Sequence, residues 1–131
     1  MRHLFVIMAI AGLAATSSTA LADTPLSDKR PSQCFESHDW QGWKAPNAKT
    51  MYINVQNHNV YRLDFSGSCP EMLYPGSHLI TTIRGSSQIC SPIDLDLKVS
   101  DMRGFATACI VSKITPMSQA EVAALPKKDR P

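Results

Sequence analysis

Residues 51–65 read MYINVQNHNVYRLDF and carry the clearest structural signal in this chain. Apolar and polar residues alternate on both sides of the tripeptide Asn57-His58-Asn59, and such alternation is typical of half-buried β-strands. Asparagine tolerates the positive φ that tight turns require. We therefore predict a β-hairpin with strands at 51–56 and 60–65. Each strand presents one apolar face: Met51, Ile53 and Val55 on the first, and Tyr61, Leu63 and Phe65 on the second.

Further strands are predicted on the C-terminal side of this hairpin. Residues 77–83 are rich in β-branched side chains, and shorter strand-like segments lie at 88–90 and 107–114, with Gly-containing turns between them. In residues 93–99, alternate positions form one apolar face: Ile93, Leu95, Leu97 and Val99. We therefore predict a mainly β, single-domain antiparallel barrel or sandwich of about six or seven strands, with a short C-terminal helix and two disulfides.

The helix is predicted from capping signals near the C-terminus. Thr115 followed by Pro116 offers one N-terminal cap, and Ser118 with Glu121 offers an alternative capping box. Pro126 ends the apolar run that follows, so the helix has about two to three turns. The charged residues 127–131 are predicted to form a disordered tail.

The first 22 residues are typical of a cleaved signal peptide. A basic start precedes an apolar run from Leu4 to Ala15, and small residues stand at Ala20 and Ala22. The run is much shorter than the roughly 20 residues that span a bilayer, and no later segment approaches that length. We predict cleavage after Ala22, a periplasmic or secreted location, and no membrane insertion of the product. Two regions follow the cleavage site and precede the tail: a flexible leader at 23–33 and a disulfide-bonded domain at 34–126.

Four cysteines remain after cleavage: Cys34, Cys69, Cys90 and Cys109. An even number in an exported domain predicts two disulfides, and the absence of close C-x-x-C pairs argues against zinc. Three pairings are possible, and the spacing does not separate them. We favour the nested pairing, with Cys69–Cys90 inside Cys34–Cys109, because the shorter loop then closes a central hairpin first.

Composition and missing motifs exclude several classes of function. Cleavage leaves 109 of the 131 residues, enough for one domain and too few for two. The net charge of +2 falls to +1 without Arg2, so no dominant basic face for nucleic acid exists. The chain has no G-x-S-x-G and no G-x-G-x-x-G motif, which are typical of serine hydrolases and nucleotide-binding enzymes. We expect no cofactor.

Two sets of side chains, one of carboxylates and one of histidines and methionines, are candidates for alternative functions. A small secreted hydrolase would use a carboxylate pair, for which the candidates are Asp94 and Asp96, with Asp64 and Asp101 near them. A periplasmic metal-binding protein would use histidine and methionine, for which the candidates are His38, His58, His78, Met51, Met72, Met102 and Met117. Alternation places the first two aspartates on the solvent face of a strand, and no two of these histidines are two or four residues apart. We therefore assign no catalytic or metal-ligating residue.

Trp40 and Trp43 are the candidates for a binding surface. They flank Gln41-Gly42, which we interpret as a turn, and aromatic side chains there can stack on sugars or apolar ligands. We therefore expect a non-enzymatic binding module whose partner is an envelope protein, a glycan or a small ligand.

Several segments together resemble a known family. They are Cys34-Phe35, Cys69-Pro70, residues 84–90 (RGSSQIC), residues 109–114, Thr115-Pro116 and residues 121–126 (EVAALP). The pattern resembles a family of small exported Gram-negative bacterial proteins with four cysteines and unknown function, over residues 34–131. This resemblance implies an exported β-domain with two disulfides, and it implies no substrate, cofactor or active site.

Overall fold

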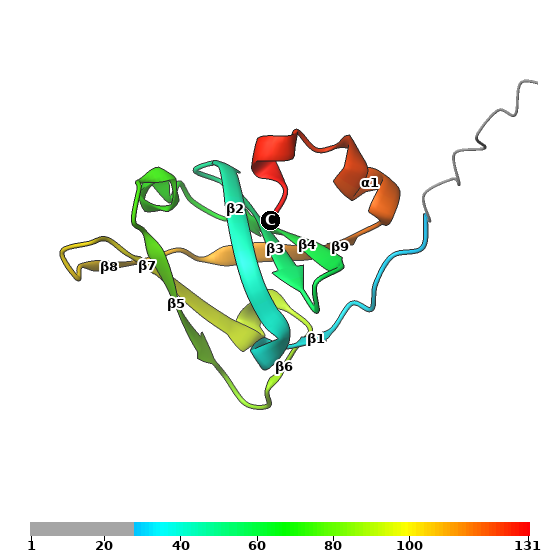
Figure 1. Cartoon of the computed structure of the whole chain (residues 1–131). Helices are drawn as coiled ribbons and strands as arrows, with labels where there is room; N and C mark the ends of the chain where they lie inside the picture. The colour runs from blue at the N-terminus through cyan, green and yellow to red at the C-terminus, as the bar shows by residue number, and fades with distance from the viewer. Residues whose placement is uncertain (1–27) are drawn as a thin grey trace, which may run out of the picture.

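A computed structural model describes residues 28–131 of the chain (Figure 1). The predicted signal peptide and the first part of the predicted leader lie outside the described residues. The elements follow in this order: β1 (Phe35–Glu36), η1 (Ser37–Asp39), β2 (Trp40–Asn47), β3 (Thr50–Val55), β4 (Asn59–Phe65), η2 (Pro70–Leu73), β5 (His78–Ile83), β6 (Gln88–Ile89), η3 (Pro92–Asp94), β7 (Leu95–Ser100), β8 (Ala106–Ala108), β9 (Val111–Met117), α1 (Gln119–Ala124) and η4 (Lys127–Asp129).

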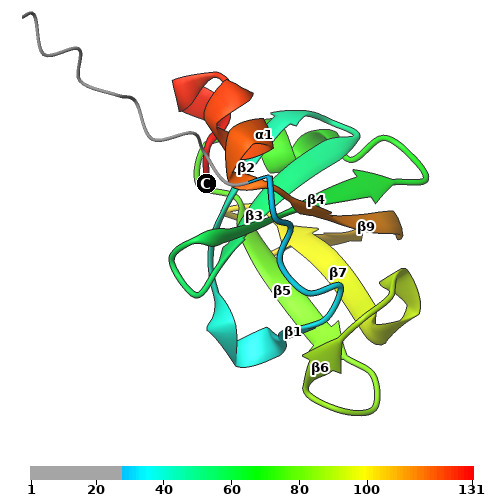
Figure 2. The same ribbon diagram turned by 90° about the vertical axis from the view of Figure 1, so that its right-hand side faces the viewer.

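The strands form three antiparallel sheets. The largest has the order β2-β3-β4-β9, the second has the order β5-β7-β8, and β1 pairs with β6 in a third sheet of two short strands. The two larger sheets face each other across one core (Figures 1 and 2). They do not close into a barrel, so the mainly β prediction is confirmed and the architecture is a sandwich.

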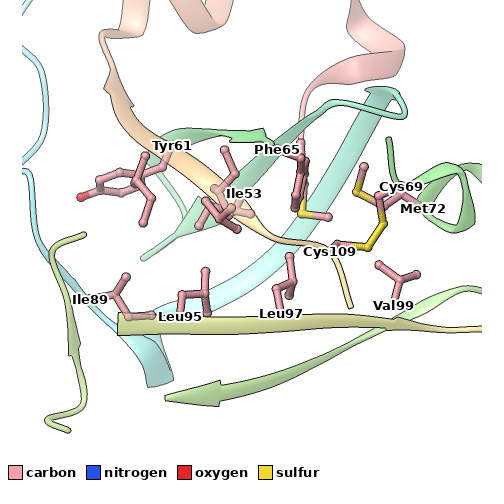
Figure 3. Packing of buried hydrophobic residues seen from close by; sticks show 14 of the residues in the cluster. Ile53, Tyr61, Phe65, Cys69, Met72, Ile89, Leu95, Leu97, Val99 and Cys109 are labelled. Carbon is pink, nitrogen blue, oxygen red and sulfur yellow. A yellow bond between two sulfur atoms is a disulfide. The ribbon is translucent and has the colours of Figure 1, made fainter. Parts of the chain in front are cut away.

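The predicted hairpin supplies one wall of the core. Its turn has positive φ at Gln56 and Asn57, and the register pairs Ile53 with Tyr61. All six residues of its predicted apolar faces are buried. Figure 3 shows three of them, Ile53, Tyr61 and Phe65, across the core from alternate residues of β7 in the opposite sheet: Leu95, Leu97 and Val99. The alternation therefore predicted both the strands and their inner faces correctly.

One stretch of chain joins the two larger sheets. β8 pairs with β7 and β9 pairs with β4, and only Cys109 and Ile110 separate β8 from β9. The Cys109 N–H donates to Leu97 O at 2.9 Å, and the Ser66 N–H donates to Ile110 O at 3.0 Å, so both ladders continue into the bend. Residues 106–117, the crossing strand, therefore close one side of the sandwich.

Both predicted disulfides form, but the pairing that we favoured is wrong. Cys34 bonds to Cys90 and Cys69 bonds to Cys109, so the bridges interlace instead of nesting. Cys34 and Cys90 meet because each directly adjoins a paired residue of β1 and β6. Cys69 and Cys109 are only 2% and 3% exposed and form part of the core at the bend of the crossing strand (Figure 3).

The C-terminal helix forms, but it is shorter than predicted. Thr115 and Pro116 belong to β9, and the N-terminal cap is Ser118, whose hydroxyl accepts from the Glu121 N–H while the Glu121 carboxylate accepts from the Ser118 N–H. The helix comprises six residues because Leu125, before Pro126, has extended backbone. Prolines disfavour helical backbone at the preceding residue.

The predicted disordered tail is instead ordered. Residues 127–129 form η4, and the Arg130 guanidinium donates to the carbonyl oxygens of Leu125 and Ala123. The last carbonyl groups of a helix have no partner within the helix, and an arginine side chain can donate to them. These two hydrogen bonds therefore hold the tail against α1.

The end of the predicted flexible leader is also attached to the domain. The Arg30 guanidinium donates to Pro116 O and to the Glu121 carboxylate, and the Tyr61 hydroxyl donates to Ser32 O at 3.0 Å. Within residues 28–131, no helix is long and apolar enough to cross a membrane.

Candidate binding groove

The two tryptophans lie on the inner face of β2. Trp40 pairs with Val55 and Trp43 pairs with Ile53, both core residues of β3. Residues three apart in a regular strand point to opposite faces, so this arrangement needs an extra residue. A β-bulge supplies it, because Gln41 has no partner of its own in the register. The predicted turn at Gln41-Gly42 is therefore wrong: these residues lie within an irregular strand.

The two tryptophan side chains lie beside an opening in the sandwich. Among the described strands, β2 pairs only with β3, and β5 pairs only with β7. The crossing strand joins the two sheets on one side, whereas β2 and β5 leave the other side open. A groove of about 300 Å³ lies between these two edges and is lined by Ser37, Trp40, Gln41, Gly42, Trp43, Leu79 and Thr81. We call it the tryptophan groove.

The exposure of Thr81 shows that the tryptophan groove reaches the interior face of β5. Thr81 pairs with Leu97 in β7, so the two side chains share the inner face of the sheet. Leu97 is buried, but Thr81 is exposed. Leu79, on the same face, is half-buried. The inner face of β5 is therefore uncovered along the edge that faces β2.

The backbone of β5 offers free hydrogen-bonding groups along this edge. The Arg84 N–H donates to Asp94 O at 3.0 Å, and hydrogen-bonded pairs alternate along an antiparallel ladder. Alternate residues therefore bond to β7, whereas Leu79, Thr81 and Ile83 direct their N–H and C=O groups away from it. These groups point toward the open side.

The lining is uncharged and combines large apolar surfaces with short polar groups. Trp40, Trp43 and Leu79 pack against the core on one side and border the groove on the other. The Gln41 side-chain carbonyl accepts from the Asn57 N–H at 2.8 Å, which fixes the bulge to the turn of the β3–β4 hairpin. The groove thus suits apolar groups that are accompanied by hydrogen-bonding ones.

The carboxylates suggested for a hydrolase each have a separate local partner. The Asp96 carboxylate pairs with Arg84 at 3.3 Å and the Asp64 carboxylate with Arg62 at 2.8 Å. The Asp101 carboxylate accepts from two backbone N–H groups of its own turn. Asp94 is not on a strand, because β7 begins at Leu95, after η3. The structure therefore does not gather these four carboxylates around one cleft.

Asp94 has a structural role in η3, where it forms a capping box with Ser91, the N-cap residue. Its carboxylate accepts from the N–H groups of Cys90 at 3.0 Å and Ser91 at 2.9 Å. These bonds, first that of Cys90 and then that of Ser91, lower the pKa of Asp94 from its ordinary value of 3.8. The early start of η3 also corrects our strand prediction, because Ile93 is 80% exposed instead of sharing the buried face of Leu95.

We expect the stability of the domain to depend on pH through the carboxylate of Asp94. Its pKa is lower in the folded state than in the unfolded state, so its stabilisation is present above about pH 4 and is lost as the pH falls through the folded pKa. The Asp94→Asn variant should melt below the wild type at neutral pH, and the two melting temperatures should converge as the pH falls below about 4. Thermal melts followed by circular dichroism measure this.

The matched control for this experiment is Asp96→Asn, which removes only a partly exposed ion pair with Arg84. Such pairs contribute about 0 to 1 kcal/mol, so this melting curve should lie close to the wild-type curve at neutral pH. Parallel pH profiles for the wild type and Asp94→Asn would contradict the capping role of Asp94.

The histidines and methionines suggested for a metal site come from different elements, and His58 and Met117 line one common hollow of about 190 Å³. His58 lies in the β3–β4 turn, His78 begins β5 and the exposed His38 lies 3.7 Å from the Asp39 carboxylate. Of the methionines, Met51 and Met72 are buried in the core, Met102 is exposed and Met117 ends β9. One group of three potential ligands exists among residues 28–131: Cys69, Glu71 and Cys109. Its two sulfurs form a disulfide, so they are not thiolates.

A second hollow shows two carboxylates that the sequence did not single out. Its volume is about 180 Å³, and Glu36, Asp39 and Tyr61 are among its lining residues. Glu36 accepts from the Ser87 hydroxyl and Asp39 from the Gln56 amide, both at 2.7 Å. Burial raises the pKa of Tyr61, so its phenol remains protonated. Both carboxylates therefore accept hydrogen bonds that join neighbouring elements, which is a structural role.

The sequence identified the tryptophans but missed the other wall of the groove. Leu79 and Thr81 come from a strand of the opposite sheet, and only the tertiary structure brings them to β2. One local signal was available: two tryptophans three residues apart around a glycine can share a strand face only through a bulge.

Comparison with known proteins assigns the chain to a family and to no activity. No curated protein and no solved structure matches the chain. One family, DUF6491, described as a family of unknown function, matches residues 1–131, the full length of the sequence. This chain, an open β-sandwich with two interlaced disulfides, therefore belongs to the DUF6491 family.

Proposed function

We propose that this protein is a binding module that captures an extended segment of a partner protein as an added β-strand in the tryptophan groove. One observation carries the proposal: two unpaired strand edges, β2 and β5, border the same groove, and two tryptophans line it. Addition of a strand to an exposed sheet edge is a common mode of peptide recognition.

The geometry of β5 assigns separate tasks to backbone and side chains. Leu79 and Thr81 direct their free N–H and C=O groups toward the open edge, where an added strand forms its ladder. Alternate side chains of that strand then point inward, beside Trp40 and Trp43. We expect the captured segment to be apolar at alternate positions, because the lining of the groove contains no charged residue.

We also propose a periplasmic or secreted location. Two disulfides join all four cysteines, and structural disulfides persist in oxidising compartments. The N-terminal sequence, with its apolar run and small residues before Asp23, agrees with export. A partner in the bacterial envelope fits this location.

Binding of arrayed peptides tests the proposed function. The array contains eight-residue peptides, the length of β2, in which apolar residues alternate with polar ones. We expect Trp43→Ala to raise the dissociation constant of the bound peptides more than tenfold, because buried tryptophans dominate the energetics of interfaces. Fluorescence anisotropy of the best binders measures the change.

A second variant separates the loss of binding from the loss of folding. Thr81→Pro removes a backbone donor that faces the groove and leaves the bonds between β5 and β7 in place, and proline is tolerated on an edge strand. It should also weaken binding, while Tyr74→Ala, an exposed aromatic outside the groove, should not. Circular dichroism confirms that each variant is folded. Unchanged peptide affinity in Thr81→Pro, or binding of neutral glycans without peptides, would overturn strand capture.

A further inference from the structure

Most of the large exposed apolar side chains of this protein lie in two loops, outside the lining of the tryptophan groove. Seven large apolar residues are exposed among residues 28–131, and four of them lie in two neighbouring loops. They are Leu73, Tyr74, Met102 and Phe105, with exposed fractions of 48%, 57%, 80% and 72%. We call these four side chains the apolar end.

The two loops of the apolar end are in contact. Met102 lies so close to Gly76 that a Cβ atom on Gly76 would be 2.7 Å from the Met102 Cγ and Sδ atoms. Gly76 also has a φ of 80°, a conformation that residues with a side chain rarely adopt. Gly76 therefore lets the 70–77 loop pack against the tip of the β7–β8 hairpin, which brings Tyr74 near Met102.

The hairpin tip is held in one conformation. The Asp101 carboxylate accepts from the N–H groups of Arg103 at 2.9 Å and Phe105 at 3.0 Å, and the Asp101 N–H donates to Phe105 O at 3.0 Å. Gly104 takes the positive φ that this turn requires. The tip presents Met102 and Phe105 to solvent at low entropic cost, and Figure 1 shows it projecting from the side of the domain.

The exposed charged side chains beside this surface are cationic. Lys98 and Arg103 are exposed, and neither forms an ion pair with an acidic side chain within the described residues. The two acids of these loops, Glu71 and Asp101, are only half-buried, but one Glu71 carboxylate oxygen is fully buried and the Asp101 carboxylate accepts from the backbone of its turn. An apolar surface with cations beside it complements an anionic lipid headgroup layer.

The size and shape of the apolar end favour a lipid surface over a second copy of the chain. A stable protein interface buries about 800 Å² on each partner, from about 20–30 residues. The apolar end offers four large side chains on two loops, and one loop is a projecting hairpin tip. Such a tip enters the boundary between headgroups and acyl chains without any segment that spans the bilayer.

We propose that the apolar end is a peripheral contact for anionic membranes. The proposal is independent of strand capture in the tryptophan groove, because it uses different residues on different loops. It orients the domain relative to the membrane, with the tip of the β7–β8 hairpin and the 70–77 loop toward the lipid.

Sedimentation with vesicles tests the proposal on the oxidised protein. We expect the wild type to sediment with vesicles of equal parts phosphatidylglycerol and phosphatidylcholine, and to remain in solution with phosphatidylcholine alone. Met102→Ser combined with Phe105→Ser should reduce the bound fraction about fivefold or more, and Arg103→Gln should reduce it about threefold to fivefold. Removal of two apolar side chains from a projecting tip should leave the melting temperature nearly unchanged.

The matched control replaces two equally exposed apolar residues outside the apolar end. Ile93 and Ile110 are 80% and 69% exposed, and their double replacement by serine should leave vesicle binding unchanged. In Phe105→Trp, anionic vesicles should shift the fluorescence emission to shorter wavelength, beyond any shift from Trp40 and Trp43 in the wild type. Absence of wild-type binding, or equal loss in both double variants, would overturn the proposal. Dimerisation that depends on Met102 and Phe105 would do the same, because a second copy would then cover the surface.

Discussion

We expect the double variant Cys69→Ala/Cys109→Ala to melt roughly 15 to 30 °C below the wild type. The bridge closes a loop of 40 residues, and the chain-entropy estimate for such a loop is roughly 4 kcal/mol. In a domain of about 100 residues, each kcal/mol shifts the melting temperature by roughly 4 to 8 °C. The cysteines are also buried in the core, so their removal adds a cavity. Calorimetry under oxidising conditions measures the shift.

The comparison that isolates the position of the bridge is Cys34→Ala/Cys90→Ala. Its loop of 56 residues gives a similar entropic contribution of roughly 4 kcal/mol, but these cysteines are only half-buried beside β1 and β6. This variant should therefore lose less stability than the first one, although its loop is longer. The reverse order would show that burial of the Cys69–Cys109 bridge at the bend of the crossing strand adds no stability beyond the contribution of its loop.

We expect Leu97→Ala to lower the free energy of unfolding by roughly 2 to 5 kcal/mol, the usual range for deleting a fully buried leucine side chain. Leu97 lies between the two larger sheets, in contact with the wall formed by the β3–β4 hairpin (Figure 3). Urea unfolding measures the change. Ile93→Ala is the control, because Ile93 lies in η3 and is exposed, and its effect should stay within about 0.5 kcal/mol. Equal effects would show that the original alternation over residues 93–99 describes the fold after all.

Local patterns predicted the elements that depend on neighbours in the sequence. The β3–β4 hairpin, its inner faces and the Ser118–Glu121 capping box all depend on residues within a few positions of one another. Ile93 is an exception because Ser91 and Asp94 cap η3 and delay the start of β7, a polar contact that overrides the apolar alternation. The failure is physical: capping competes with strand formation at this position.

Features that depend on contacts distant in sequence were beyond these patterns. The nested disulfides followed from a preference for short loops. The strand at 88–90 was predicted, but its partner β1 is only two residues long and was not, so no pattern brought Cys34 to Cys90. β2 was missed because its bulge interrupts the alternation of its apolar residues. Trp40 and Trp43 were expected at a binding surface, but the groove itself exists only because β5, from the other sheet, ends up across from them.

The crossing strand joins the two larger sheets on the side of the domain opposite the tryptophan groove. If a strand captured on β5 also bonded to β2, the two edges would have to stand two interstrand spacings apart, about 9.5 Å. Because the two sheets share residues 106–117, the bend at Cys109 and Ile110 is the point at which the chain passes from one sheet to the other. The Cys69–Cys109 bridge lies at this bend, so it constrains the angle between the two sheets and, through it, the separation of the β2 and β5 edges that border the tryptophan groove.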